Sequence, residues 1–526
     1  MRRDSYENRI EGKIIKTLIT NHPQITSYYS RILSVRMGGE NTNQNADKKS
    51  FGRDVGKLVT GTIVAQAVGI CLMPIITRIF GPDIYGVASV FISIVSILTV
   101  VSCMRYELAI LLPKEQKEAG GVFLACLGVL LCFTIVLIPV FLFFGDRIVN
   151  LFNAPELSSY VLLIPLLVFI DGLYLALRYW NTRNKRFGTQ AATQALQSIT
   201  GNGCKLGLGF AGQIHALSLI LAQIMGQLLG TIILLIRALR TDFVVLKNSF
   251  SLLNIKTQMT RYRKFPLIDT WSNLMNVISW QLPVLMLSGF FSPAIAGLYT
   301  LGFQMIQMPM SFIGGSIRQV FLQRGAVAKH DGTLSHLTEE ICSVLIMLAV
   351  MPFLLLGIVG GDLFGLVFGA EWYEAGVFAQ ILALWAMIWF VASIMSELIY
   401  VMEYQGFGFF YNVLNLSTRF LSLLIGGIVG NVYLGLFLFM ASGVFVYGFM
   451  GYVVVRCSGG SFAVIWRNVR KAVLVSAAGA GVVLCLSLSG VFSGWFVCVA
   501  AVGVGVGYVG WLVLKEKRVR EYLGCG

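Results

Sequence analysis

The sequence predicts an all-α polytopic membrane protein of about fourteen transmembrane helices, arranged as two six-helix lobes related by an internal parallel repeat plus two C-terminal helices. Three observations predict this fold: long apolar runs, basic residues confined to alternate loops, and short matches between the two halves. Apolar residues make up 56% of the 526 residues and charged residues only 12%. A soluble protein has about twice that charged share, so this much apolar surface requires lipid as its solvent.

One helix crossing requires roughly 20 apolar residues, and fourteen runs meet that length. They lie at 56–80, 85–112, 119–144, 158–180, 188–211, 215–237, 266–290, 295–318, 340–361, 375–402, 407–429, 431–455, 468–489 and 493–514. We therefore divide the chain into a polar and basic tail (1–54), an N-lobe (55–265), a C-lobe (266–457), and a last pair of helices with a basic C-terminal tail (458–526).

Positive charge orients these spans. With the N-terminus inside, 35 of the 40 Lys and Arg residues fall in inner segments, two (Arg78 and Arg147) in outer loops, and three inside spans. This is the asymmetry that the positive-inside rule describes, and it predicts a cell-membrane protein with both termini in the cytoplasm. The net charge of +15 lies between apolar runs, so we expect no nucleic-acid partner.

The two halves carry the same short motifs in the same order at corresponding helix ends. Residues 80–86 and 291–297 both read F-x-P-x-I-x-G, at an offset of 211. Phe152-Asn-Ala resembles Phe368-Gly-Ala at an offset of 216, and Phe187-Gly resembles Phe407-Gly at 220. Six helices per repeat is an even number, so both copies insert the same way up and are related by an axis along the membrane normal.

Polar residues follow single faces of several spans at intervals of three or four residues, which predicts a hydrated central cavity. The candidate lining residues are Gln66, Gln194, Gln197, Asn273, Asn276, Gln304, Gln307, Asn412 and Asn415. The alternative for any one amide is a hydrogen bond between neighbouring helices, and that alternative is the commoner one.

Ionisable residues inside spans cost roughly 2.5–3.5 kcal/mol each on insertion scales, so they are candidates for function. Arg105, Lys205 and Arg419 form the predicted cationic site, and Arg78 is added at the end of the first span. The candidate ion-coupling carboxylates are Asp171, Glu397 and Asp269. Two structural alternatives stay open, because Asp171 stands seven residues from Arg178 on one helical face, and Arg105 stands two residues from Glu107.

Known catalytic signatures are missing from the sequence. It has no GxxxxGK[ST] phosphate loop, no HExxH, and no GxSxG in a strand–helix context. The ten cysteines form no CxxC pair and mostly fall in apolar stretches, so we expect buried apolar residues and neither metal nor cofactor. We expect no enzyme, because the outer loops at 145–157 and 362–374 are too short to hold the acceptor of a polysaccharide polymerase.

Three stretches resemble a known family. Residues 77–86 (TRIFGPDIYG) look like the turn between the first two helices of bacterial and archaeal polysaccharide flippases. Residues 105–113 (RYELAILLP) resemble their second-helix motif, and residues 178–187 (RYWNTRNKRF) resemble the inner end of their fourth helix. These flippases belong to the multidrug/oligosaccharidyl-lipid/polysaccharide exporter superfamily, and the resemblance runs from about residue 51 to 457.

The resemblance implies a transporter that moves an isoprenoid-pyrophosphate-linked oligosaccharide to the outer leaflet by alternating access, for cell-surface polysaccharides such as O-antigen. Arg105, Lys205 and Arg419 would then hold the pyrophosphate. The expected partners are the lipid-linked oligosaccharide, membrane lipids, and the polymerase and glycosyltransferases of the same pathway. A drug or metabolite exporter and a lipid II flippase of the same fold stay open as alternatives.

Overall fold

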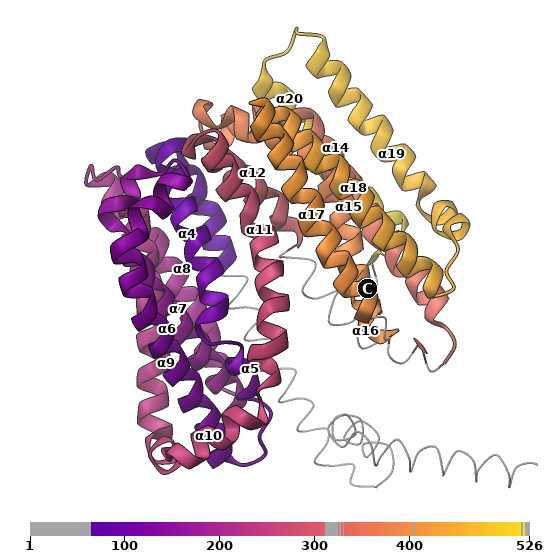
Figure 1. Ribbon diagram of the computed structural model, residues 1–526. Coiled ribbons are helices and arrows are strands. Elements are labelled where there is room, and N and C mark those ends of the chain that lie inside the picture. Colours follow the sequence, from indigo (N-terminus) through magenta and orange to yellow (C-terminus); the bar gives the residue numbers. More distant parts are fainter. Residues whose placement is uncertain are drawn as a thin grey trace, which may run out of the picture. The chain divides into compact units, whose positions relative to one another are not determined.

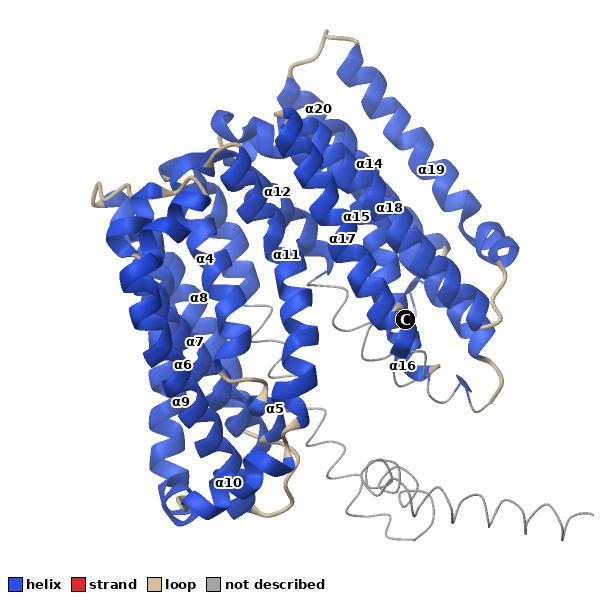
Figure 2. Cartoon of the chain, viewed as in Figure 1, coloured by secondary structure: helices blue, strands red, loops and turns tan. Residues whose placement is uncertain are grey.

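The computed structural model describes residues 65–310, 325, 328–329, 331–402, 405–516 and 519–520, and across those residues the chain forms helices joined by short loops (Figures 1 and 2). The predicted tail 1–54 and the start of the first span lie outside the described residues. The all-helical fold class is therefore confirmed.

The N-terminal half forms a bundle in which α6, α7, α8 and α9 run side by side (Figure 1). Its elements are the helix Ala65–Ile79, α4 (Pro82–Ser102), α5 (Tyr106–Ala109), α6 (Gln116–Leu151), η2 (Pro155–Tyr160), α7 (Leu163–Arg183), α8 (Phe187–Phe210) and α9 (Ala216–Ser249). α8 packs mainly against α9, and α7 packs against both α6 and α9.

The second half continues through the short helix α10. Its elements are α10 (Leu252–Arg261), the π-helical turn η3 (Phe265–Asp269), α11 (Thr270–Phe290), α12 (Pro293–Pro309), α14 (Leu334–Phe368), η5 (Ala370–Trp372), α15 (Tyr373–Met395), α16 (Glu397–Val401), α17 (Gln405–Val429), α18 (Val432–Cys457), α19 (Phe462–Leu488) and α20 (Gly494–Lys515). α14 packs against α15 on one side, and both α19 and α20 pack against it as well.

Ten described helices are long and apolar enough to cross a membrane, so the predicted count of fourteen spans is not confirmed. The described parts of the helix Ala65–Ile79 and of α12 are shorter, and both adjoin residues outside the described part of the chain. α8 and α11 have the length but not the apolar character, since α8 carries Gln190, Gln194, Gln197 and Lys205 and α11 carries two asparagines. Four of the nine predicted lining residues, Gln194, Gln197, Asn273 and Asn276, therefore lie on these two less apolar helices, while Asn412 and Asn415 lie on a helix that is apolar enough to span.

The predicted second span, 85–112, is also too long. α4 ends at Ser102, and the chain turns through Met104 and Arg105 with φ of 45° and 60° before α5 begins. Left-handed backbone costs a residue with a side chain about 1–2 kcal/mol. Two such residues in a row are unusual and tend to occur at functional sites, so this break draws attention to Arg105.

The two F-x-P-x-I-x-G segments contact each other. They form the starts of α4 and α12, which pack together. A Cβ on Gly86 would collide with the carbonyl group of Pro293, and a Cβ on Gly297 would collide with the carbonyl oxygen of Pro82. Since Pro82 and Gly86 correspond to Pro293 and Gly297 at the offset of 211, the contact is reciprocal. Only glycine lets the two backbones approach this closely.

Two hydrogen bonds repeat the same symmetry. Thr77 Oγ1 donates to the carbonyl oxygen of Phe368 at 3.1 Å, and Ser288 Oγ donates to that of Phe152 at 2.5 Å. Thr77 and Ser288 are 211 residues apart, and the two phenylalanines are 216 apart. These are the offsets found in the sequence, so each half bonds to the other as the other bonds to it, which is the contact pattern of two copies related by a two-fold axis. The lobe boundaries at 265 and 457 stay predictions.

Candidate transport site

Arg105 lies at the strained turn after α4 and joins the two repeats. Its Nε donates to Asp269 Oδ2 at 2.8 Å, and its Nη1 lies 3.6 Å from Glu107 Oε1. The local partner Glu107 was one of the alternatives open in the sequence, but the shorter contact is to Asp269, which ends the π-helical turn η3. π-helical turns often occur at functional sites. The structure thus pairs a predicted cation with a predicted coupling carboxylate.

Glu107 is almost fully buried beneath this pair, with 1% of its surface exposed. It lies on α5, after the span Pro82–Ser102 has ended. Burial raises the pKa of the Glu107 carboxyl to about 7, although a backbone hydrogen bond and the Arg105 guanidinium act in the opposite direction. Glu107 Oε2 has no hydrogen-bond partner among the described residues.

A second polar group lies inside the N-terminal bundle. Gln197 on α8 donates from Nε2 to Gln227 Oε1 on α9 at 3.1 Å. Gln227 in turn lies near the carboxylate of Asp171 on α7, and Gln197 near the hydroxyl of Tyr174. This polar group joins three helices, and the alternative pair of Asp171 with Arg178 is not formed among the described residues. Its amides act as interhelical bonds in this conformation.

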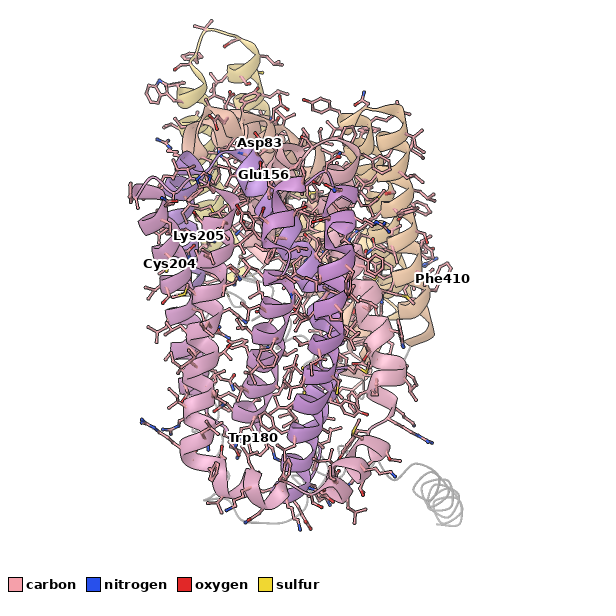
Figure 3. All side chains as sticks on the ribbon, turned by 60° about the vertical axis from the view of Figure 1, so that its left-hand side comes forward. Asp83, Glu156, Trp180, Cys204, Lys205 and Phe410 are labelled. Carbon is pink, nitrogen blue, oxygen red and sulfur yellow. The ribbon has the colours of Figure 1, made fainter. Side chains whose placement is uncertain are left out.

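Lys205 is half-buried on α8. Figure 3 shows it beside Cys204, between the end of the bundle marked by Asp83 and Glu156 and the end marked by Trp180. Among the described residues it has no hydrogen bond or ion pair. A cation held in a helical bundle without a protein counter-ion favours an anionic ligand.

Arg419, in contrast, is 2% exposed and has protein partners on three sides. Its Nη1 donates to the carbonyl and hydroxyl oxygens of Ser279 at 3.0 and 3.1 Å, and its Nη2 to Tyr447 Oη at 3.0 Å. The guanidinium lies 4.3 Å from the centre of the Trp280 ring, a cation–π distance. Its contacts share no residue with those of Arg105, so in this conformation it is a packing residue, and ligand binding by Arg419 stays a prediction.

The other predicted residues have separate surroundings. Arg78 is exposed and donates to the carbonyl oxygen of Leu366 at 2.8 Å, at the end of α14. Gln304 accepts from Tyr85 Oη at 3.0 Å, and Asn415 donates to Tyr447 Oη at 3.2 Å. The remaining lining residues are half-buried or exposed: Gln66, Gln194, Asn273, Asn276, Gln307 and Asn412. Arg318, predicted on the same face as Gln304, lies outside the described residues.

The family model described as "Polysaccharide biosynthesis protein" matches residues 75–377, more than half of the chain. The chain belongs to the polysaccharide biosynthesis protein family. No curated protein sequence matches the chain.

The fold of this polysaccharide biosynthesis protein is also that of known transporters. It resembles the inward closed conformation of the lipid II flippase MurJ with a TM-score of 0.68 at 12% identity, over 87% of this chain and 98% of that one. It resembles an inward-facing multidrug resistance MATE family transporter of the MOP superfamily with a TM-score of 0.58 at 12% identity, over 76% and 99%. A mutant of the Vibrio cholerae MATE transporter VcmN gives 0.51 at 15% identity, over 79% and 98%.

The match to the polysaccharide biosynthesis protein family covers only some of the predicted site residues. Residues 75–377 include Arg78, Arg105, Asp171, Lys205 and Asp269. Most of the aromatic residues around Arg419 lie beyond residue 377, outside the match. Glu397, Asn412 and Asn415 lie outside it as well. The Arg105–Asp269 pair and the Asp171 network therefore lie within the part of the chain that defines the family.

Sequence reasoning missed one strong polar contact. Asp242 accepts from Arg186 Nη1 and Nη2 at 2.6 and 2.7 Å, and from Trp180 Nε1 at 2.9 Å. Trp180 and Arg186 belong to the family-like motif 178–187, but their partner on α9 lies 62 and 56 residues away in the sequence. The contact ties the ends of α7 and α9 together through the loop before α8, which makes this motif structural.

Proposed function

We propose that this protein moves an isoprenoid-pyrophosphate-linked oligosaccharide from the inner to the outer leaflet of the cell membrane by alternating access, for the biosynthesis of a cell-surface polysaccharide. The observation that carries the proposal is the family match on a two-repeat transporter fold. A polysaccharide assembled on a lipid carrier requires a protein that takes a hydrophilic head across hydrocarbon. Moving a head group across the membrane requires no catalytic residue.

The contacts between the repeats suit alternating access. At the end predicted to lie outside, they consist of the reciprocal glycine contact and the hydrogen bonds made by Thr77 and Ser288. Near the end predicted to lie inside, Arg105 bonds to Asp269. The neutral hydrogen bonds contribute about 0.5–1.5 kcal/mol each and the charged Arg105–Asp269 bond at most about 3 kcal/mol, so substrate binding can drive their exchange.

The pyrophosphate would be held first by Arg105 near the inner end, and at a later step of the cycle by Lys205, which lies further along α8 toward the outer end. Arg105 can grip a phosphate through two hydrogen bonds once Asp269 releases it, while Lys205 acts as a point charge. Exchange of the Asp269 carboxylate for a phosphate keeps the guanidinium paired throughout. The polar faces of α8 and α11 would offer amides to the sugars, a mode that tolerates different sugar compositions.

Reconstitution tests the function. The protein is reconstituted in liposomes that contain a fluorescent isoprenoid-pyrophosphate oligosaccharide. It should move the labelled lipid between the two leaflets, so that the label becomes accessible to an impermeant quencher on both faces of the bilayer. Lipid II and a cationic drug are presented to the same vesicles. Faster transfer of lipid II than of the oligosaccharide would identify a lipid II flippase, transport of the drug alone would identify an exporter, and either result would overturn the proposal.

The proposed orientation places both termini in the cytoplasm, because nearly all cations lie in segments on one side. On a cysteine-depleted background, Leu252→Cys on α10 and Val491→Cys between α19 and α20 place thiols at positions that are 81% and 79% exposed. An impermeant maleimide added to intact cells should label only the residue-491 variant. Labelling of the residue-252 variant without lysis would show that the orientation is wrong.

Ion coupling is proposed for Asp171, which lies in a polar network within the N-terminal bundle. Asp171→Asn keeps the shape of the side chain beside Gln227 but removes the charge, so transport should lose its dependence on an imposed proton or sodium gradient. Glu397→Gln and Asp269→Asn test the other two carboxylates in the same vesicles. Glu156→Gln, on the exposed turn η2, is the control, and unchanged gradient dependence in all three test variants would exclude these carboxylates.

A further inference from the structure

The strained turn that carries Arg105 also brings together two cysteines and a glutamate. The Cys103, Glu107 and Cys126 side chains each present one ligand atom, and these three atoms all lie within 4.8 Å of one another. Cys103 and Glu107 flank Arg105 by two residues on either side, and Cys126 comes from α6. All three are buried, with at most 1% of their surface exposed.

The carboxylate in this cluster is incompletely satisfied. Glu107 Oε1 lies 3.6 Å from Arg105 Nη1, but Oε2 is buried with no hydrogen-bond partner among the described residues. A buried carboxylate oxygen without a partner is energetically unfavourable, because it has lost its hydration and gained no hydrogen bond in exchange. Glu107 carries the one carboxylate in the cluster, so the thiols of Cys103 and Cys126 are the ligand groups next to it.

We propose that Cys103, Cys126 and Glu107 bind one thiophilic metal ion. Because two of its three donors are thiolates, this ligand set favours Zn²⁺ and Cu⁺ over harder ions such as Mg²⁺ or Ca²⁺. Zn²⁺ is favoured by charge, since with these three ligands it leaves one net negative charge, which Arg105 can offset at its present distance. Binding releases the two thiol protons to solvent.

The geometry requires only a small closure. Ligand atoms around a tetrahedral zinc ion are about 3.5–3.8 Å apart, given Zn–S bonds of about 2.3 Å and Zn–O bonds of about 2.0 Å. The three atoms here already lie within 4.8 Å. The carbonyl oxygen of Gly172 on α7 accepts from the Cys103 thiol at 3.5 Å, so an oxygen donor stands next to the three ligands for a fourth position.

Such an ion would act on the transport site through Arg105. The turn at residues 103–107 is held in left-handed backbone at Met104 and Arg105, and both of its ends would be fixed to the metal. The ion would tie this turn to α6 and thereby set the direction of the Arg105 guanidinium toward Asp269. Cysteines 23 residues apart give no metal-binding spacing in the sequence, which is why their pattern predicted only buried apolar residues.

Metal content of the purified full-length protein tests the proposal. The detergent-solubilised protein is incubated with Zn²⁺, or with Cu⁺ under reducing conditions, passed over a desalting column and analysed by mass spectrometry for metals. The wild type should retain about one ion per chain. The matched control Cys132→Ser should retain the same amount, because Cys132 is an exposed cysteine on α6, the helix that carries Cys126. Cys103→Ser and Cys126→Ser should each retain less than a tenth of that amount.

A second measurement does not depend on variants. Cd²⁺ added to the wild-type protein should produce the ultraviolet charge-transfer band of thiolate ligation, and prior Zn²⁺ should suppress it. Retention of Cu⁺ in place of Zn²⁺, with the same loss in the two serine variants, would support the site and identify the ion. The absence of both retained metal and the cadmium band, or equal retention by Cys126→Ser and Cys132→Ser, would overturn it.

Discussion

Arg105→Ala should weaken binding of the pyrophosphate-linked substrate by roughly 10- to 150-fold, because a charge-assisted hydrogen bond contributes about 1.5–3 kcal/mol. Asp269→Asn removes the ion pair but keeps the guanidinium, so it should bind the substrate at least as tightly as the wild type. The measurement is the Kd of an isoprenoid pyrophosphate for the purified protein. Arg105→Lys should recover part of the affinity, since the charge survives but the two-pronged grip is lost.

The matched control is Arg178→Ala. Arg178 is a cation of the same half, and its guanidinium lies 5.9 Å from the centre of the neighbouring Tyr179 ring. Its removal should leave the affinity unchanged within about threefold, as expected for a surface-type contact worth below 1 kcal/mol. If Arg105→Ala and Asp269→Asn lose affinity equally, the pair acts as a structural link and Arg105 does not contact the head group.

Gly86→Ala or Gly297→Ala should disfavour the described conformation about 5- to 150-fold, because overpacking of this kind costs about 1–3 kcal/mol. The added methyl group meets backbone atoms of the opposite repeat, which cannot rotate aside as a side chain could. α4 and α12 must then separate at their starts. Transport, which in the proposed mechanism passes through this conformation, should fall by a factor within the same range.

Cross-linking measures the population of that conformation. Tyr85 Oη on α4 donates to Gln304 Oε1 on α12 at 3.0 Å, so cysteines at positions 85 and 304 should be joined across the repeats by a bifunctional thiol reagent. The yield should fall in either alanine variant and stay unchanged in Gly128→Ala, because a Cβ on Gly128 meets nothing within 4 Å. An undiminished yield in Gly86→Ala would show that the helices accommodate the methyl group.

Much of the fold could be predicted because lipid imposes a simple rule on composition. Apolar runs gave helices at the expected places, and the offset of 211 between two short motifs gave the repeat that Pro82, Gly86, Pro293 and Gly297 now show as a contact. The apolar pattern could not show where α4 ends. Residues 106–112 stay largely apolar, so the break at Met104 and Arg105, which depends on backbone angles, had no signal in hydropathy.

The site was harder to predict because its partners are distant in sequence. The residue types were recognisable, since charges inside apolar runs are rare. Their pairing was not: Asp269 lies 164 residues from Arg105. Arg419 was grouped with Arg105 because both are cations, but Trp280, Phe439 and Tyr447 from other helices surround it. A stripe of polar residues on one helix shows which face of that helix is polar, but it does not show which other helix packs against that face.

The reciprocal bonds of Thr77 and Ser288 also bear on how such a chain could arise. Two copies of a half-length protein, related by a two-fold axis, would make both bonds from a single pair of positions, as in an isologous homodimer. Fusion of two gene copies keeps that interface while freeing each copy to change alone. The halves now differ where symmetry no longer constrains them: the first holds the Asp171 network, and the second holds Arg419 among aromatic rings.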